Sequence, residues 1–179
     1  HQDPVPILIK GLRRLEYRGY DSAGLALLDG KNLSSIKKAG KVSDLSDKVS
    51  SKSIQGTCGI AHTRWATHGV PNDTNAHPHL DKTGKIALVH NGIIENYDSI
   101  KKTLEGRGVV FKSETDSEVL VQLISELYYK GEGDLDFKDA VKAALQEVVG
   151  AYGIVAMCSD EPNTLVAARM GSPLVLGVG

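Results

Sequence analysis

The sequence predicts an α+β fold in which helices and sheets form separate layers of one domain. Segments with the apolar content and flanking turns of strands occur before, between and after segments with helical periodicity. Neighbouring strand segments are joined by short connections, which favours this fold class over a regular parallel, doubly wound sheet. The chain has 179 residues, 41% of them hydrophobic, so it is long enough to bury the core of a single domain.

The first predicted element is an amphipathic helix that begins after Asp3. The Asp3 side chain suits a helix N-cap, Pro4 suits the first helical position, and apolar residues follow at helical spacing up to Leu15. The other elements expected in this half are a strand over 23–28, a strand around residue 36, a short helix over 42–49, and strands over 57–65 and 85–90.

The second half of the chain predicts three more helices. One spans 96–107, one starts in the segment Ser113-Glu-Thr-Asp-Ser-Glu118 and reaches about residue 129, and one spans 135–149. The pairs Ser113/Asp116 and Thr115/Glu118 both resemble capping boxes. The strands expected in this half cover 109–111, 152–158, 164–168 and 174–178.

Charge and composition favour a small-molecule or protein partner. The 21 basic and 22 acidic residues give a net charge of -1 and are interspersed, so no long-range field attracts nucleic acid or an anionic membrane. No apolar run has the length of a membrane span. The two cysteines, Cys58 and Cys158, make no disulfide framework, which predicts a reducing, cytoplasmic location.

The two ends of the sequence predict a fragment. The chain opens at His1 rather than at a methionine, and it closes on the apolar segment 171–179 without a polar tail. Because a terminal strand would expose a sticky edge, we expect a parent protein that continues beyond this segment.

Five of the six histidines lie between residues 62 and 90, so a metal site has to be considered. They are His62, His68, His77, His79 and His90. They fall on strands and a loop, without a cysteine pair or a carboxylate at the spacing of known zinc sites. We therefore expect no metal, and expect the histidines to form hydrogen bonds with loop backbone.

Other residue types here suit a small polar substrate. Arg64 offers a planar fork for a carboxylate, and the adjacent Trp65 could wall a pocket or could simply belong to the core. Asp116 could cap a helix or bind an ammonium group, in which case it and Arg64 would hold both ends of an α-amino acid. Asn91 and Gly92 follow a predicted strand and form either an ordinary turn or an oxyanion hole.

Five segments together resemble the glutaminase domain of the glucosamine-6-phosphate synthase family, which are class II glutamine amidotransferases with an N-terminal nucleophile. The resemblance runs in order through nearly the whole chain. Amidophosphoribosyltransferases share the fold but differ in these motifs. The segments are EYRGYDSAG at 16–24, GIAHTRWATHG at 59–69, NAHPH at 75–79, HNGIIEN at 90–96 and SETD at 113–116.

The resemblance implies a glutamine site. Arg64 would bind the glutamine α-carboxylate, Thr67 and His68 would line the same pocket, and His77 would lie close by. Asp116 would hold the α-ammonium group.

The resemblance also implies catalytic roles. Asn91 and Gly92 would form the oxyanion hole, Arg18 would lie near the nucleophile and help to order the site, and Trp65 would gate the passage by which ammonia leaves. No metal and no organic cofactor would be needed.

The nucleophile of the family is a cysteine at the mature N-terminus, and its own α-amino group serves as the base. This chain has no such residue. Cys58-Gly-Ile60 imitates the motif, but it is internal and lacks an α-amino group, so we interpret Cys58 and Cys158 as small buried hydrophobic residues. We therefore expect this chain alone to be inactive.

The implied fold is a four-layer α/β/β/α sandwich with two antiparallel sheets, and residues 1–179 would be an incomplete glutaminase domain. The resemblance implies that the complete enzyme is a homodimer. It would add isomerase domains that bind fructose 6-phosphate and use the ammonia to form glucosamine 6-phosphate. Two alternatives are a non-catalytic amino-acid-binding module and an amidotransferase with another ammonia acceptor.

Overall fold

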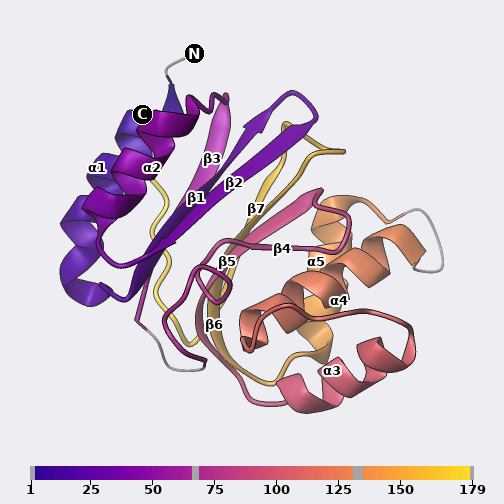
Figure 1. Cartoon of the computed structure of the whole chain (residues 1–179). Helices are drawn as coiled ribbons and strands as arrows, with labels where there is room; N and C mark the ends of the chain where they lie inside the picture. Colours follow the sequence, from indigo (N-terminus) through magenta and orange to yellow (C-terminus); the bar gives the residue numbers. More distant parts are fainter. Residues whose placement is uncertain (1–2, 66–68, 131–134, 178–179) are drawn as a thin grey trace.

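Two antiparallel sheets lie face to face between two outer layers of helices. This arrangement is seen in the computed structural model of the chain, which describes residues 3–65, 69–130 and 135–177 (Figure 1). Helices α1 (Pro4–Leu15) and α2 (Val42–Lys52) cover the first sheet. Helices α3 (Tyr97–Gly106), α4 (Asp116–Lys130) and α5 (Phe137–Glu147) cover the second. The predicted α+β, four-layer architecture is confirmed.

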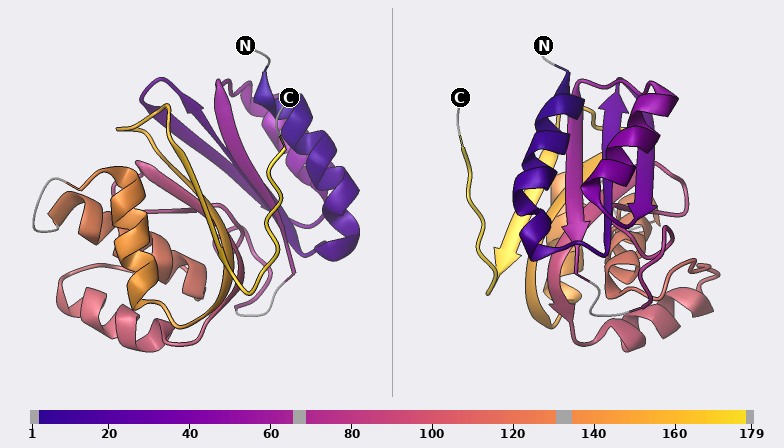
Figure 2. Two further views of the ribbon diagram at one scale, coloured as in Figure 1. Left: turned by 180° about the vertical axis from the view of Figure 1, so that it is seen from behind. Right: turned by 60° about the vertical axis from the view of Figure 1, so that its left-hand side comes forward.

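The first sheet has the strand order β2-β1-β3, with both pairs antiparallel. Figure 2 shows α1 and α2 side by side on its outer face. The helix α1 begins as predicted, because the Asp3 carboxylate accepts a hydrogen bond from the Val5 N–H at 3.0 Å. The strands of this sheet are β1 (Ser22–Asp29), β2 (Asn32–Ala39) and β3 (Cys58–Arg64).

The second sheet has the strand order β4-β5-β6-β7, again antiparallel throughout. Its strands are β4 (His79–Leu80), β5 (Ile86–Ile94), β6 (Gly150–Cys158) and β7 (Leu165–Met170). The two-residue strand β4 is absent from the sequence prediction, because so short a segment carries no periodic signal.

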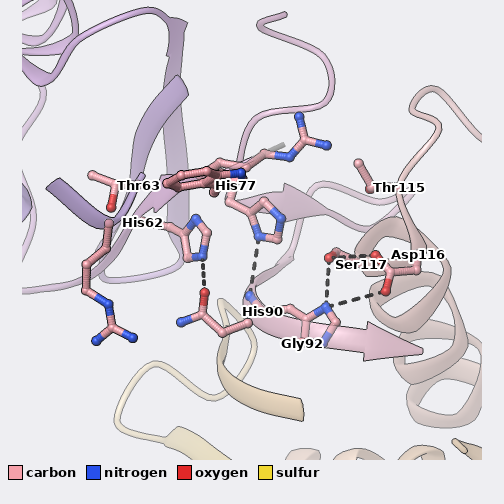
Figure 3. A pocket seen from close by; sticks show the side chains of 12 residues that line it. His62, Thr63, His77, His90, Gly92, Thr115, Asp116 and Ser117 are labelled. Atoms are coloured by element: carbon pink, nitrogen blue, oxygen red, sulfur yellow. Dashed lines mark hydrogen bonds and ion pairs between the residues drawn. The ribbon is translucent and has the colours of Figure 1, made fainter. Parts of the chain in front are cut away.

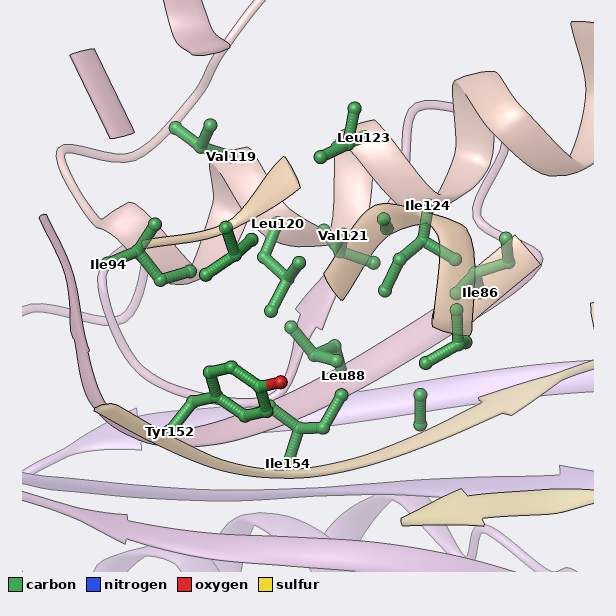
Figure 4. Close-up of a cluster of buried hydrophobic side chains, with 14 of the residues drawn as sticks. Ile86, Leu88, Ile94, Val119, Leu120, Val121, Leu123, Ile124, Tyr152 and Ile154 are labelled. Carbon is green, nitrogen blue, oxygen red and sulfur yellow. The ribbon is translucent and has the colours of Figure 1, made fainter. Parts of the chain in front are cut away.

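The largest hydrophobic cluster lies between the second sheet and its helices. Figure 4 shows side chains of β5 and β6 facing side chains of α4. Ile86, Leu88 and Ile154 come from the strands and Leu120 and Ile124 from α4, and each is at most 1% exposed. Burying one such side chain contributes roughly 1.5–3 kcal/mol. This cluster therefore fixes α4 against β5, and both elements carry site residues.

Two predicted strands are wrong. Residues 109–111 and the described residues of 174–178 form no strand. Val109 is buried and Val110 is exposed, which imitates strand alternation, but the Val109 N–H donates to the Leu104 carbonyl at the end of α3. Val175 is 91% exposed. A strand needs a neighbouring strand for its backbone groups, and neither segment is assigned one.

The turn between β4 and β5 is organised by Asp81, which is 5% exposed. Its carboxylate accepts hydrogen bonds from the N–H groups of Thr83, Lys85 and Ile86 at 2.9–3.1 Å. It also accepts one from the Ser125 hydroxyl at 2.8 Å, which connects the turn to α4.

Replacing Asp81 with asparagine is expected to lower the free energy of unfolding by about 1–3 kcal/mol, since one carboxylate oxygen becomes an amide nitrogen that cannot accept these bonds. Urea unfolding measures the change. Asp47→Asn is a matched control on the exposed face of α2, where we expect a change within about 0.5 kcal/mol. Equal effects of the two substitutions would contradict the role of Asp81.

Candidate active site

A cavity of about 200 Å³ lies where the end of β3, the end of β5 and the start of α4 meet. This volume is below the range of roughly 300–1,000 Å³ found for drug-sized ligands, so it suits a small molecule. Its walls come from both sheets. The lining residues are Arg18, His62, Thr63, Arg64, Trp65, His77, His90, Asn91, Gly92, Thr115, Asp116 and Ser117.

Strand β3 supplies a cation to the cavity. His62 and Arg64 are two positions apart on the strand and therefore share one face. Arg64 is only 4% exposed, and one of its terminal nitrogens donates to the Gly69 carbonyl at 3.4 Å. Burial lowers the pKa of Arg64 from its usual value, while Asp21 and Asp116 act in the opposite direction. A buried guanidinium of this kind favours an anionic group beside it.

Helix α4 supplies an anion. Asp116 is its first residue and is 6% exposed. The Asp116 Oδ2 accepts a hydrogen bond from the Ile94 N–H at 2.9 Å and lies 4.0 Å from the His90 Nδ1. The positive end of the helix dipole also favours a carboxylate at this position. Asp116 thus supplies a fixed negative charge to one wall of the cavity.

The cap of α4 is Thr115 rather than Asp116. The Thr115 Oγ1 accepts a hydrogen bond from the Glu118 N–H at 3.2 Å. The Glu118 carboxylate accepts from the N–H groups of Lys112 and Ser113 instead of Thr115, so the predicted Thr115/Glu118 capping box is only half formed. The cap is therefore made without Asp116, whose side chain lines the cavity.

Strand β5 supplies Asn91 and Gly92. The Asn91 Oδ1 and the His62 Nε2 are joined by a hydrogen bond of 2.9 Å that runs from the second sheet to the first. Gly92 has φ +132°, and a Cβ added there would lie 2.0 Å from the Ala151 carbonyl oxygen. Glycine is therefore required at this position for steric and conformational reasons.

Three histidines, His62, His77 and His90, line the cavity and are drawn in Figure 3. The rings of His62 and His77 stack at 4.3 Å, and His79 lies edge-on to His77 at 4.7 Å. The His77 Nδ1 accepts from the His90 N–H at 3.3 Å. Burial lowers the pKa of His62 to about 4 and those of His77 and His79 well below the usual 6.5. In the described residues, no three His, Cys, Asp or Glu side chains are grouped so that they could hold a metal ion.

The low pKa values of these histidines predict that the folded chain becomes less stable at acid pH. We expect the free energy of unfolding to fall as the pH is lowered from 6.5 toward 4, because the unfolded chain binds protons there while the buried rings stay neutral. One such ring contributes a slope of up to about 1.4 kcal/mol per pH unit.

Urea unfolding at steps of pH tests this expectation in the chain and in His77→Gln. The substitution should flatten the slope by up to about 1.4 kcal/mol per pH unit, and comparing the two proteins cancels the contribution of the carboxylates. An unchanged slope in the variant would show that His77 titrates alike in the folded and unfolded chains.

Arg18 and Trp65 stand at the rim. Arg18 ends the short 3-10 helix Glu16–Arg18 and is exposed. The Trp65 side chain is 57% exposed, so its interpretation as a core residue is wrong. Its ring meets that of Tyr20 edge-on, with 5.5 Å between the centroids.

Seven of the nine residues that the sequence singled out line this one cavity. They are Arg18, Arg64, Trp65, His77, Asn91, Gly92 and Asp116. The other two, Thr67 and His68, lie outside the described residues.

Five lining residues are not part of the predicted substrate site: His62, Thr63, His90, Thr115 and Ser117. Strand alternation from Arg64 could have indicated His62. Neither cysteine lines the cavity. Cys158 is buried as predicted, whereas Cys58 is only partly buried.

Residues 31–169 match the glutamine amidotransferase domain family. This match covers more than half of the chain, so the chain belongs to this family.

Two curated relatives are named glutamine–fructose-6-phosphate aminotransferase (isomerizing). The protein from Bacteroides thetaiotaomicron is 57% identical over 175 residues, which cover 97% of this chain and 28% of the relative. The protein from Chlorobaculum tepidum is 55% identical over 181 residues, which cover 99% and 29%. The chain therefore spans less than a third of the length of these relatives.

The solved structures that match this chain include another glutamine amidotransferase. The glutamine phosphoribosylpyrophosphate amidotransferase from B. subtilis, solved with ADP and GMP, matches with a TM-score of 0.78 and 29% identity, covering 94% of this chain and 35% of that one. An allosteric regulatory enzyme of purine biosynthesis matches with a TM-score of 0.74 and 31% identity, covering 86% and 33%. No helix in the described residues has the length and apolar character needed to cross a membrane.

Proposed function

We propose that this chain is the glutaminase part of an enzyme that transfers ammonia from L-glutamine to fructose 6-phosphate and so forms glucosamine 6-phosphate. The observation that carries the proposal is the gathering of seven expected site residues around one cavity. The names of the Bacteroides and Chlorobaculum relatives support the choice of acceptor.

Glutamine would lie between the two opposite charges of the cavity. The Arg64 guanidinium would bind the α-carboxylate, and the Asp116 carboxylate would bind the α-ammonium group. Thr67, His68 and His77 would complete this end of the site. The side-chain amide of glutamine would then extend toward Asn91 and Gly92, where a nucleophile can attack it.

The nucleophile would be a cysteine that precedes His1 in the whole protein. Neither Cys58 nor Cys158 lines the cavity, and burial raises the pKa of both thiols, which disfavours the thiolate. The thiolate would attack the glutamine amide carbon with the cysteine α-amino group as the base. The oxyanion would be stabilised by Asn91 and Gly92, and water would then hydrolyse the thioester to glutamate.

The released ammonia would pass Trp65 toward an acceptor domain outside this chain, and Arg18 would help to order the site around the cysteine. We further propose that the whole protein is a cytoplasmic homodimer that binds neither nucleic acid nor membrane. It would need no metal and no organic cofactor.

Glutamate release tests the proposal. We expect none above a heat-killed control from residues 1–179, and steady release from the whole protein when its mature terminus is cysteine. Replacing this terminal cysteine with alanine should abolish glutamate release but leave glutamine binding intact. Steady release from residues 1–179 would overturn the assignment of the nucleophile, and binding without release by the whole protein would favour a non-catalytic amino-acid-binding module.

A further inference from the structure

A second, larger cavity of about 770 Å³ lies between β2 of the first sheet and β4 of the second. Helices α2 and α4, residues 73–74, the turn between β4 and β5, and residues 108–113 contribute the other walls. None of the described residues that line it also lines the candidate active site. It is therefore a distinct space, and the proposed glutamine reaction makes no use of it.

Lysine side chains are concentrated around this cavity. Two of them have carboxylate partners, because Lys48 pairs with Asp73 at 2.9 Å and Lys82 pairs with Glu126. The other two, Lys37 and Lys112, have no carboxylate within ion-pair distance among the described residues. The four lysines in the lining are Lys37, Lys48, Lys82 and Lys112.

The carboxylates in the lining are already engaged by the fold. The Asp81 oxygens accept bonds within the β4–β5 turn, and those of Glu118 accept from the backbone before α4. Asp73 accepts from the Ala39 N–H as well as from Lys48. These groups balance part of the positive charge, but they leave the donors of Lys37 and Lys112 available.

Ser35 and Lys37 line the cavity from the first sheet. They are two positions apart on β2 and so share a face. Toward the described residues, the Lys37 Nζ donates one hydrogen bond, to the Thr74 carbonyl at 3.0 Å, of the three that an ammonium can donate. The Ser35 Oγ is buried and has no hydrogen-bond partner among the described residues. A buried hydroxyl without a partner is unfavourable in the protein alone, and a ligand would satisfy it.

We propose that this cavity binds a small molecule that carries a phosphate group, with Lys37, Lys112 and the Ser35 hydroxyl as the phosphate ligands. Phosphate oxygens accept several hydrogen bonds at once, and lysine binds them as a point charge. The environment of Lys37 supports this choice, since burial lowers its pKa to about 8 against the opposing effects of Glu118 and Asp73. A phosphate beside it favours the charged ammonium.

The two cavities share a thin wall. His79 lines the second cavity and packs edge-on against His77, which lines the first. Thr115, also in the first cavity, is hydrogen-bonded to the His79 Nε2 at 3.1 Å. A phosphate in the second cavity would raise the pKa of His79, because a nearby negative charge favours the protonated ring. The NMR signals of His79 therefore report on occupancy.

Titration of the chain with inorganic pyrophosphate, followed by calorimetry at constant ionic strength, tests the proposal without any glutamine. We expect saturable binding that weakens about tenfold or more in Lys37→Met. Ser35→Ala should weaken it roughly threefold without lowering the free energy of unfolding, because the hydroxyl has no partner in the fold. Lys142→Met, at an exposed lysine on α5, is the matched control and should bind like the unaltered chain.

Three results would overturn the proposal. They are the absence of saturation below about 10 mM, equal affinity of the unaltered chain and the folded Lys37→Met variant, and equal weakening by Lys142→Met. The last two would indicate nonspecific attraction of anions to surface charge. Since the proposed glutaminase function is tested by glutamate release, either proposal can fail without the other.

Discussion

The Arg64→Met variant is expected to lose glutamine affinity by at least roughly 30-fold. Arg64 is 4% exposed and, in the proposed complex, is the cation that the glutamine α-carboxylate meets in the cavity. Removing one member of a buried, hydrogen-bonded charge pair costs about 2–5 kcal/mol, which corresponds to roughly 30-fold to several-thousand-fold in affinity. Methionine keeps part of the side-chain length while removing the charge. Calorimetry with glutamine on the chain itself measures the loss and does not require the nucleophile.

Two further substitutions sharpen this test. Arg64→Lys keeps the charge but loses the planar fork, so its affinity should fall between those of the unaltered chain and Arg64→Met. Arg107→Met removes an exposed arginine at the end of α3 and should leave glutamine binding unchanged. Unchanged affinity in a folded Arg64→Met variant would show that the carboxylate binds elsewhere.

The Gly92→Ala variant is expected to lose more than about 4 kcal/mol of the free energy of unfolding, a size that marks a specific structural conflict. The added Cβ would lie 2.0 Å from the Ala151 carbonyl oxygen, and φ at Gly92 is +132°, where side chains other than hydrogen are strained. Relief of this steric clash would require β5 to shift away from β6 at the position beside Asn91. Urea unfolding measures the stability, and glutamine calorimetry on any folded fraction measures the effect on the site.

Gly11→Ala is the matched control for Gly92→Ala. Gly11 lies inside α1, and nothing is within 4 Å of a Cβ added there. Alanine at this position should raise the free energy of unfolding by up to about 1 kcal/mol. If the free energy of unfolding of Gly92→Ala lay within about 1 kcal/mol of that of the unaltered chain, β5 would be able to accommodate a methyl group despite the short contact with Ala151.

Much of the fold could be predicted because several elements carry more than one local signal. The helix α1 has a cap, a proline and an apolar stripe that agree, and β1 is an apolar run that ends at a glycine turn. Residues 109–111 carried only a short apolar run, which a strand and a segment packed on a core share. A short pattern cannot tell whether a neighbouring strand exists, so this prediction failed.

Prediction of the site from local sequence patterns has the same limit, because its contacts join residues that are far apart in the chain. The motifs named Asn91 and Arg64, but no local pattern reveals that His62, 29 residues before Asn91, is hydrogen-bonded to it across two sheets. The exposed position of Trp65 could not be inferred either, because its surroundings come from separate segments of the chain. Such contacts depend on how the layers stack, which sequence periodicity does not encode.

The cavity is shared between two layers that form no strand pairing with each other, since Arg64 belongs to the first sheet and Asn91 to the second. An occupant that touches both would hold the sheets together as well as fill the space between them. Glutamine at 100 times its dissociation constant would then add about 2.7 kcal/mol to the stability of the fold. Amide hydrogen exchange should accordingly slow in β1 and β6 as well, which are interior strands of the two sheets. The occupancy of the glutamine site would therefore set the rate at which the whole sandwich opens.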